Sequence, residues 1–108
     1  MDYKKYYKIQ EQYCLDLLST LDENEMEMLK TVYKVANHKS SMYCNSFCYL
    51  DFKEYPKLWM EFFNLMESLS ILGIVVRTTI FEDRRAVQYD FAQNFLQILY
   101  NKFNDENV

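Results

Sequence analysis

The sequence predicts a mostly α-helical domain with one small β-hairpin, an α+β fold. The chain of 108 residues contains only one glycine and one proline, which leaves little room for many tight turns. Half of the residues are hydrophobic, enough to build one core. The apolar positions recur at helical spacing over most of the chain and alternate, as in strands, over residues 74–91. We therefore expect a single domain spanning residues 1–108.

Two helices are expected in the first third of the chain. Residues 3–20 carry apolar side chains at helical spacing, at Tyr7, Cys14, Leu18 and Leu21. A second helix is expected to begin after Asp22, because Glu25 lies three residues further on, as in a capping box. Its inner positions continue to about His38.

Residues 39–54 leave two alternatives open. Ser40 and Ser41 could cap a short helix over residues 42–50, which would place Cys44 and Cys48 one turn apart, or part of the segment could be a strand. Pro56 then suits the first position of a helix, where its missing N–H costs nothing.

The helix that Pro56 begins is expected to run to Leu72. Its apolar stripe consists of Leu58, Phe62, Leu65, Leu69 and Leu72. Trp59, Phe63 and Met66 widen this stripe beyond what one small core needs. These three side chains either pack under the terminal helices or form a protein interface.

Gly73 follows this helix, where glycine is favoured because it adopts a left-handed conformation without a Cβ penalty. Strands are expected at 74–81 and 86–91, with a turn at 82–85. Ile74, Val76 and Ile80 should share one face, opposed by Val87, Tyr89 and Phe91. A terminal helix within 92–108 completes the domain, after an N-terminal helix (1–20) and a central part (21–91).

Catalytic and metal sites are hard to assemble from these residues. The single histidine, His38, lies near a helix end, and one glycine cannot supply a phosphate-binding loop. Cys14, Cys44, Cys48 and His38 are scattered, whereas structural zinc sites show paired short spacings. We expect no enzymatic activity, no cofactor, no metal and no small-molecule substrate.

Charge and cysteine content bear on partners and compartment. The net charge of −4 disfavours nucleic-acid binding, although the acidic residues cluster at 22–27 and 105–106, away from the predicted hairpin. Three cysteines form no disulfide framework, so an intracellular, reduced protein is expected. No apolar run approaches the roughly 20 residues of a membrane span, so no membrane association is expected and the protein should be soluble.

A helix that leads into a two-stranded hairpin with a charged tip, after other short helices, is the outline of a winged helix. The chain's three arginines, Arg77, Arg84 and Arg85, all lie in this hairpin, and arginine suits both base edges and the minor groove. Arg77 is expected on the outward strand face. The alternative is that 82–85 is an ordinary solvated turn whose acidic and basic residues neutralise each other.

The helix before the hairpin is the expected recognition helix, although its charge is mixed. Asn64 is an outward polar position, and Lys53 and Lys57 near the N-terminus could contact phosphates. Glu61 and Glu67 on the same helix would repel them.

Two stretches of sequence resemble a known family. The run from Leu15 through Leu21-Asp22 to Met28-Leu29, and the order Leu72-Gly73-Ile74, Arg84-Arg85 and a closing strand, resemble the C-terminal winged-helix domain of origin-recognition-type replication initiators. This resemblance implies contact with duplex DNA through Arg77, Arg84, Arg85, Lys57 and Asn64. Small winged-helix transcription regulators, whose terminal helices often form a dimer, are nearly as good a match.

The sequence therefore predicts a non-enzymatic winged-helix protein that binds double-stranded DNA, in replication initiation or transcription regulation. The alternative is an acidic winged-helix module that binds another protein or forms a homodimer. Its contacts would be Trp59, Phe63, Met66 and the tyrosine-rich N-terminal helix.

Overall fold

A computed structural model describes residues 3–39, 46–78 and 87–105 of the chain. In these residues the chain is mostly helical, with a small antiparallel sheet. The elements in order are α1 (Tyr3–Leu18), α2 (Glu23–Lys39), β1 (Phe47–Cys48), the 3₁₀-helix η1 (Tyr49–Phe52), α3 (Pro56–Ile71), β2 (Val75–Arg77), β3 (Gln88–Phe91) and α4 (Gln93–Asp105).

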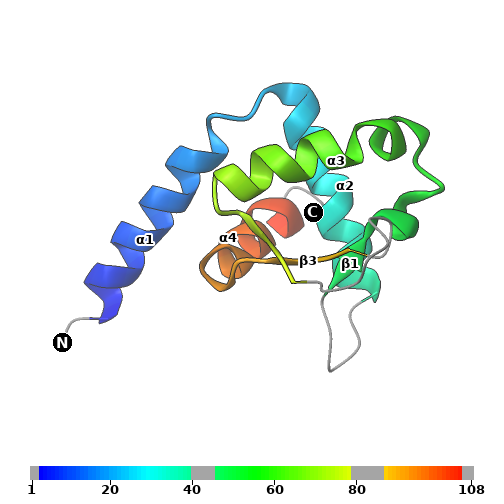
Figure 1. The fold of residues 1–108 in the computed structure, drawn as a ribbon. Coiled ribbons are helices and arrows are strands. Elements are labelled where there is room, and N and C mark those ends of the chain that lie inside the picture. The colour runs from blue at the N-terminus through cyan, green and yellow to red at the C-terminus, as the bar shows by residue number, and fades with distance from the viewer. Residues whose placement is uncertain (1–2, 40–45, 79–86, 106–108) are drawn as a thin grey trace.

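The sheet has β3 at its centre, paired antiparallel with β1 on one side and with β2 on the other. Helix α3 contacts β2, η1 and α2, and α1 contacts α4. Figure 1 shows the sheet, α2, α3 and α4 gathered around one centre, whereas α1 projects from this body with the chain's N-terminus at its far end. The fold class expected from the sequence, helices with a small β element, is confirmed at this level.

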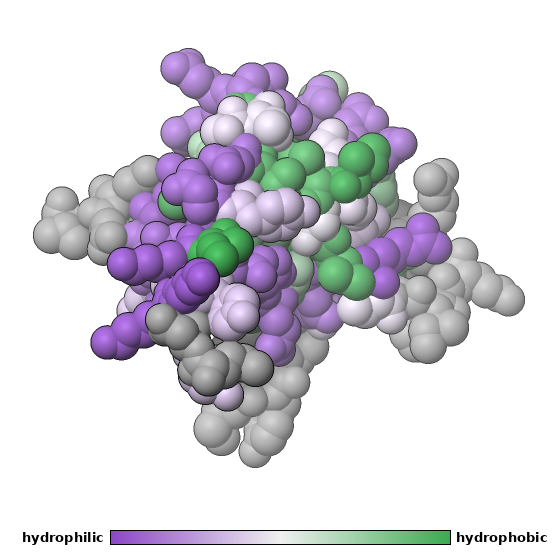
Figure 2. Space-filling model, turned by 90° about the vertical axis from the view of Figure 1, so that its left-hand side faces the viewer, coloured by the Kyte–Doolittle hydropathy of each residue, from purple (hydrophilic) through white to green (hydrophobic). Residues whose placement is uncertain are grey.

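Among the described residues, helix α1 packs against the rest of the molecule only through its second half. Only Cys14 and Leu18 of its residues are buried, and every residue from 3 to 10 is exposed. Figure 2 shows the molecule from the side on which α1 projects, where hydrophobic side chains gather near the middle of the face among hydrophilic ones. On that colour scale tyrosine counts as slightly hydrophilic, so the α1 tyrosines do not stand out in green.

The start of α2 is the predicted capping box. The N–H of Glu25 donates to the Asp22 carboxylate (2.7 Å), and the N–H of Asp22 donates to the Glu25 carboxylate (3.1 Å). These bonds satisfy donors that the first helical turn cannot pair internally. The prediction from the Asp22–Glu25 spacing is therefore confirmed.

The ambiguous segment is a strand followed by a 3₁₀-helix over the part that the structure describes. Cys48 lies in β1, so of the two alternatives the strand is confirmed and the helix over 42–50 is wrong at this position; Cys44 lies outside the described residues. The N–H of Cys48 donates to Asp51 (2.8 Å), which fixes the change from strand to η1. Pairing with β3, a contact distant in sequence, decides this outcome, and local propensity could not reveal it.

Helix α3 begins and ends as expected. Pro56 occupies the first turn, and Gly73 has a φ of 76°, in the left-handed region. The N–H of Ile74 donates to the carbonyl of Leu69 (2.8 Å), and the N–H of Gly73 donates to that of Ser70 (3.1 Å). This pair of bonds is a Schellman motif, which ends the helix and turns the chain into the sheet.

The register of the hairpin corrects the expected strand faces. Val75 pairs with Phe91 and is buried, whereas Val76 pairs with Asp90 and is 50% exposed, so Val76 was assigned to the wrong face. The reason is that Ile74 belongs to the helix cap, and regular alternation starts only at Val75. The inward positions of β3 and the residue before it, Val87, Tyr89 and Phe91, are buried as predicted. Ile80 lies outside the described residues.

An aromatic cluster between the sheet and α3 forms a large part of the core. Phe47 of β1 and Tyr89 of β3 stack with ring centroids 6.0 Å apart, and Phe62 of α3 meets Tyr89 edge-on at 5.8 Å. Phe52 of η1 packs against Phe62 at 5.4 Å. Such pairs add about 0.5–1.5 kcal/mol each beyond their buried area. The cluster therefore holds α3 at a fixed position relative to the sheet.

Candidate nucleic-acid interface

The exposed face of α3 is the surface that the sequence analysis assigned to recognition. Its exposed residues include Lys57, Met60, Glu61, Asn64, Glu67 and Ile71. This face carries one lysine, Lys57, and two glutamates, Glu61 and Glu67, so the exposed face of α3 is not basic. Met60 and Ile71 are about 80% exposed, at 81% and 78%, which gives this face apolar character as well.

A groove of about 870 Å³ runs between α3 and β2. Asn64 and Glu67 line it from the helix, and Val76 and Arg77 line it from the strand. Two predicted site residues, Asn64 and Arg77, are thus brought together from segments that are separate in sequence. The groove combines amide, carboxylate and guanidinium groups with apolar walls.

Arg77 does not lie on the outward strand face that was expected. It pairs with Tyr89, and directly opposed residues of an antiparallel pair share a face, so Arg77 lies on the face that Tyr89 and Val75 present to α3. It is nevertheless exposed, at the end of β2. The shift follows from the strand register, because the strand begins one residue later than the alternation suggested.

The remaining predicted cations fall into two groups. Lys53 follows η1 and Lys57 lies in the first turn of α3, and both are exposed. Lys57 lines a separate hollow of about 330 Å³ with Glu27 and Glu54, so it shares its surroundings with carboxylates. Arg84 and Arg85 lie outside the described residues.

The aromatic strip proposed as an alternative protein interface is divided by the fold. Met66 is 1% exposed and belongs to the core, so it presents no surface to a partner. Trp59 stacks on Tyr49 at 3.6 Å, and Phe63 meets the same ring at 4.9 Å, so in the described part of the chain η1 covers them rather than the terminal helices. Phe63 remains 37% exposed and lines the α3–β2 groove.

Sequence reasoning missed several groove residues. Ile71 lies one and two turns after Glu67 and Asn64 on α3, and this spacing was sufficient to place it on the same face. Val76 was missed because its face depends on the strand register, for which the sequence carried no clear signal. The groove is therefore more apolar than the sequence analysis indicated.

Cys14 occupies a buried position between α1 and α4. Its thiol donates to the carbonyl of Asn94 (3.6 Å), and its sulfur accepts from the side chains of Gln10 (3.9 Å) and Asn94 (3.8 Å). Burial raises the pKa of the Cys14 thiol, partly offset by the hydrogen bond from Gln10. In residues 3–39, 46–78 and 87–105, no group of three or more His, Cys, Asp or Glu side chains could hold a metal ion.

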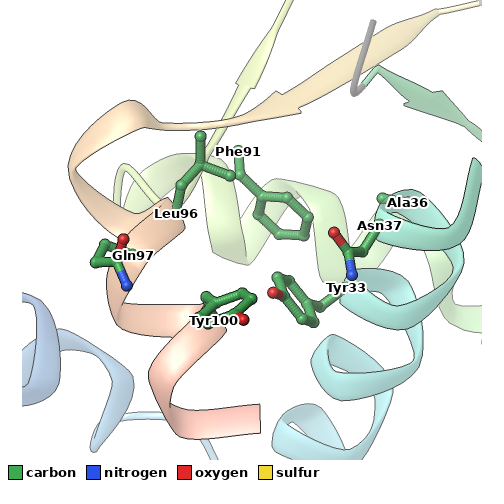
Figure 3. Close-up of a pocket in the computed structure, with 7 residues that line it drawn as sticks. All are labelled: Tyr33, Ala36, Asn37, Phe91, Leu96, Gln97 and Tyr100. Carbon is green, nitrogen blue, oxygen red and sulfur yellow. The ribbon is translucent and has the colours of Figure 1, made fainter. Parts of the chain in front are cut away.

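A smaller hollow of about 220 Å³ lies between α2, β3 and α4 (Figure 3). The rings of Tyr33, Phe91 and Tyr100 point toward its middle, and the amides of Asn37 and Gln97 lie at its edge (Figure 3). Small-molecule sites usually measure about 300–1,000 Å³. The hollow is below this range, and its amides do not converge on one point.

No family model, curated protein or solved structure matches this chain. Within the described ranges, every helix is too short or too polar to cross a bilayer.

Proposed function

We propose that this chain is a non-enzymatic winged-helix protein that binds double-stranded DNA. The observation that carries the proposal is the order of elements. A helix, a short strand, a helical turn, a second helix and a hairpin follow one another as α2, β1, η1, α3, β2 and β3, with the sheet order β1–β3–β2. In a winged helix this order presents the helix before the hairpin to the major groove and the hairpin to the flanking backbone or minor groove.

The exposed residues of α3 and of the hairpin suggest how the protein would bind DNA. The free face of α3 would enter the major groove, which accommodates an α-helix, and Asn64 could pair with an adenine edge. Arg77, which lines the same groove as Asn64, would contact the adjacent backbone. Lys53 and Lys57 would hold phosphates at the N-terminal end of α3, where the helix dipole assists. Arg84 and Arg85 would add the contacts of the hairpin tip.

The electrostatics of this surface limit the affinity. Glu61 and Glu67 lie on the same face of α3 as Asn64, and the net charge is −4. With five candidate cations, the slope of log K against log salt should be no steeper than about −4.5. Binding should therefore be measurable at low salt and weak at physiological salt.

The test is a titration of labelled duplex and single-stranded DNA at about 50 mM and about 200 mM salt. Wild-type protein is compared with Arg84→Ala/Arg85→Ala and with Lys53→Ala/Lys57→Ala. The matched control is Lys102→Ala, which removes a positive charge at the hollow between α1 and α4. We expect both double variants to weaken duplex binding at least tenfold and to flatten the salt slope, while the control binds like wild type. Absence of duplex binding at low salt would overturn the proposal.

The apolar walls of the α3–β2 groove favour a second candidate, recognition of a protein segment. Phe63, Ile71 and Val76 are all at least 37% exposed around this groove. β2 also lies at the edge of the sheet, and an extended peptide can add to such an edge. Ile71→Ala would weaken this mode without adding charge to the face of α3 proposed to contact DNA, and it leaves Arg84 and Arg85 intact, so a variant that still binds DNA but loses a peptide ligand separates the two functions.

A further inference from the structure

Helix α1 carries a stripe of side chains, here called the seam, that is largely exposed in the part of the chain that the structure describes. Tyr3, Tyr6 and Tyr13 are 77%, 57% and 57% exposed, and Ile9 beside them is 58% exposed. Aromatic rings expose a large apolar area, and an isolated helix of this length is marginal in water. The exposure of so many rings on one projecting helix therefore indicates a missing partner.

The spacing along the seam is that of a coiled coil. Tyr3, Tyr6, Gln10, Tyr13 and Leu17 follow one another at alternating intervals of three and four residues. This interval keeps the five side chains on one stripe of the helix. Cys14 and Leu18, which pack into the protomer, lie on the neighbouring stripe. Leu17, at the end of the stripe, also packs against the core, whereas Tyr3, Tyr6, Gln10 and Tyr13 are exposed and form a second face that can pair.

The distribution of charge along α1 favours a second copy of this helix, in antiparallel orientation, as the partner. Its lysines, Lys4, Lys5 and Lys8, all lie in the first half, and its carboxylates, Glu11 and Asp16, lie in the second half. A second copy of α1 running antiparallel would place the basic half of each helix beside the acidic half of the other. It would also oppose the two helix dipoles favourably, whereas a parallel pair would juxtapose like charges.

We propose that this chain forms a symmetric homodimer through antiparallel pairing of α1 along the exposed part of this stripe, Tyr3–Tyr6–Gln10–Tyr13. The interface is isologous, so Gln10 meets Gln10 of the second copy at the two-fold axis, and Tyr6 lies beside Tyr13 of that copy. A polar pair at such a position fixes register at some cost in stability. This proposal does not depend on DNA binding.

The area available matches a modest dimer. With about 200 Å² for a tyrosine side chain, the exposed fractions of Tyr3, Tyr6 and Tyr13 leave roughly 380 Å² per protomer for burial. Ile9 and the stems of the lysines add to this. The total is smaller than the roughly 800 Å² per partner of a standard interface, so the dimer should be weak and should depend on protein concentration.

The first test is sedimentation equilibrium of the full chain over a wide range of concentrations. Wild type should show a monomer–dimer equilibrium, and Tyr6→Ala/Tyr13→Ala should raise the dissociation constant at least tenfold. The matched control is Tyr100→Ala, which removes a ring of similar exposure (53%) from α4. A wild type that stays monomeric at every concentration, or a double variant that dimerises like wild type, would overturn the proposal.

The second test reports the geometry of the pair with variants that each keep at least two of Tyr3, Tyr6 and Tyr13. In a Cys44→Ser background, Gln10→Cys should form an intermolecular disulfide under mild oxidation, whereas Gln12→Cys, exposed on another face, should not. In the same background, mass spectrometry of a mixture of the single variants Tyr6→Cys and Tyr13→Cys, each of which keeps the other tyrosine, should find links between positions 6 and 13 of different chains. Links of 6 to 6 and 13 to 13 would indicate a parallel pair and contradict the antiparallel arrangement.

Discussion

Gly73 is the residue whose backbone conformation joins α3 to the sheet. Its φ of 76° lies in the left-handed region, and a Cβ built at this position meets nothing within 4 Å. The cost of a side chain is therefore conformational, not steric contact with neighbours. We expect Gly73→Ala to lower the free energy of unfolding by about 1–2 kcal/mol, measured by urea denaturation. Gly73→Asn, which tolerates this region better, should cost less; an equal cost for both would contradict this explanation.

The buried thiol of Cys14 should make the stability of the protein depend on pH in the alkaline range. Its pKa in the folded state is raised above the ordinary 9.0, so the folded protein favours the protonated form. Below pH 9 both states hold the proton, and this group adds no pH dependence. As the pH rises through 9 toward the folded-state pKa, the unfolded thiol ionises first, and stability falls.

Comparison with Cys14→Ala isolates this effect. At pH 7.5 the variant should be less stable by about 1 kcal/mol, because it loses a buried sulfur and its hydrogen bonds. The difference between wild type and variant should shrink between pH 8.5 and pH 10.5, since only wild type carries the Cys14 titration. Tyrosine and lysine titrations cancel in this difference. A constant difference over that range would show that the thiol's pKa is not raised.

At the scale of elements, the sequence predicted the starts and ends of helices, because single residues nearby in the chain determine them. The capping box at Asp22, the proline at the start of α3 and the glycine after it each follow from a backbone requirement that one residue type meets. β1 and the face of Val76 could not be predicted in this way. Both depend on pairing with β3, which lies far along the chain.

The register of β2 is open to a direct test with two adjacent valines. Val75 is 2% exposed and Val76 is 50% exposed. Val75→Ala removes two buried methyl groups and should cost about 2 kcal/mol of unfolding free energy. Val76→Ala removes exposed ones and should cost about 0.5 kcal/mol or less. Each value comes from urea denaturation, and equal costs, or the reverse order, would contradict the register.

At the scale of the whole molecule, the sequence predicted which residues of the candidate site are exposed but not which of them line the same groove. Exposure of Lys53, Lys57 and Asn64 followed from helical periodicity, because each lies opposite or beyond the apolar stripe of α3. Asn64 and Arg77 line the same groove because α3 packs against β2, and no local sequence pattern encodes this packing. Likewise, the sequence showed that α1 is rich in tyrosine, but only its projection from the body revealed a free face.

The two proposals together predict a dependence of DNA binding on duplex length. A dimer through α1 presents two copies of α3 and of the hairpin, so a duplex that spans both binds with an effective-concentration advantage of about 10²–10⁴. A duplex of one half-site, about 10 bp, can engage only one copy. Tyr6→Ala/Tyr13→Ala changes no charge and lies outside the proposed DNA surface. We expect it to weaken binding to a 40-bp duplex at least tenfold at low salt and to leave binding to the 10-bp duplex unchanged, measured by fluorescence anisotropy. Equal losses on both lengths would place the tyrosines in direct DNA contact, and no loss on either would mean that each protomer binds DNA alone.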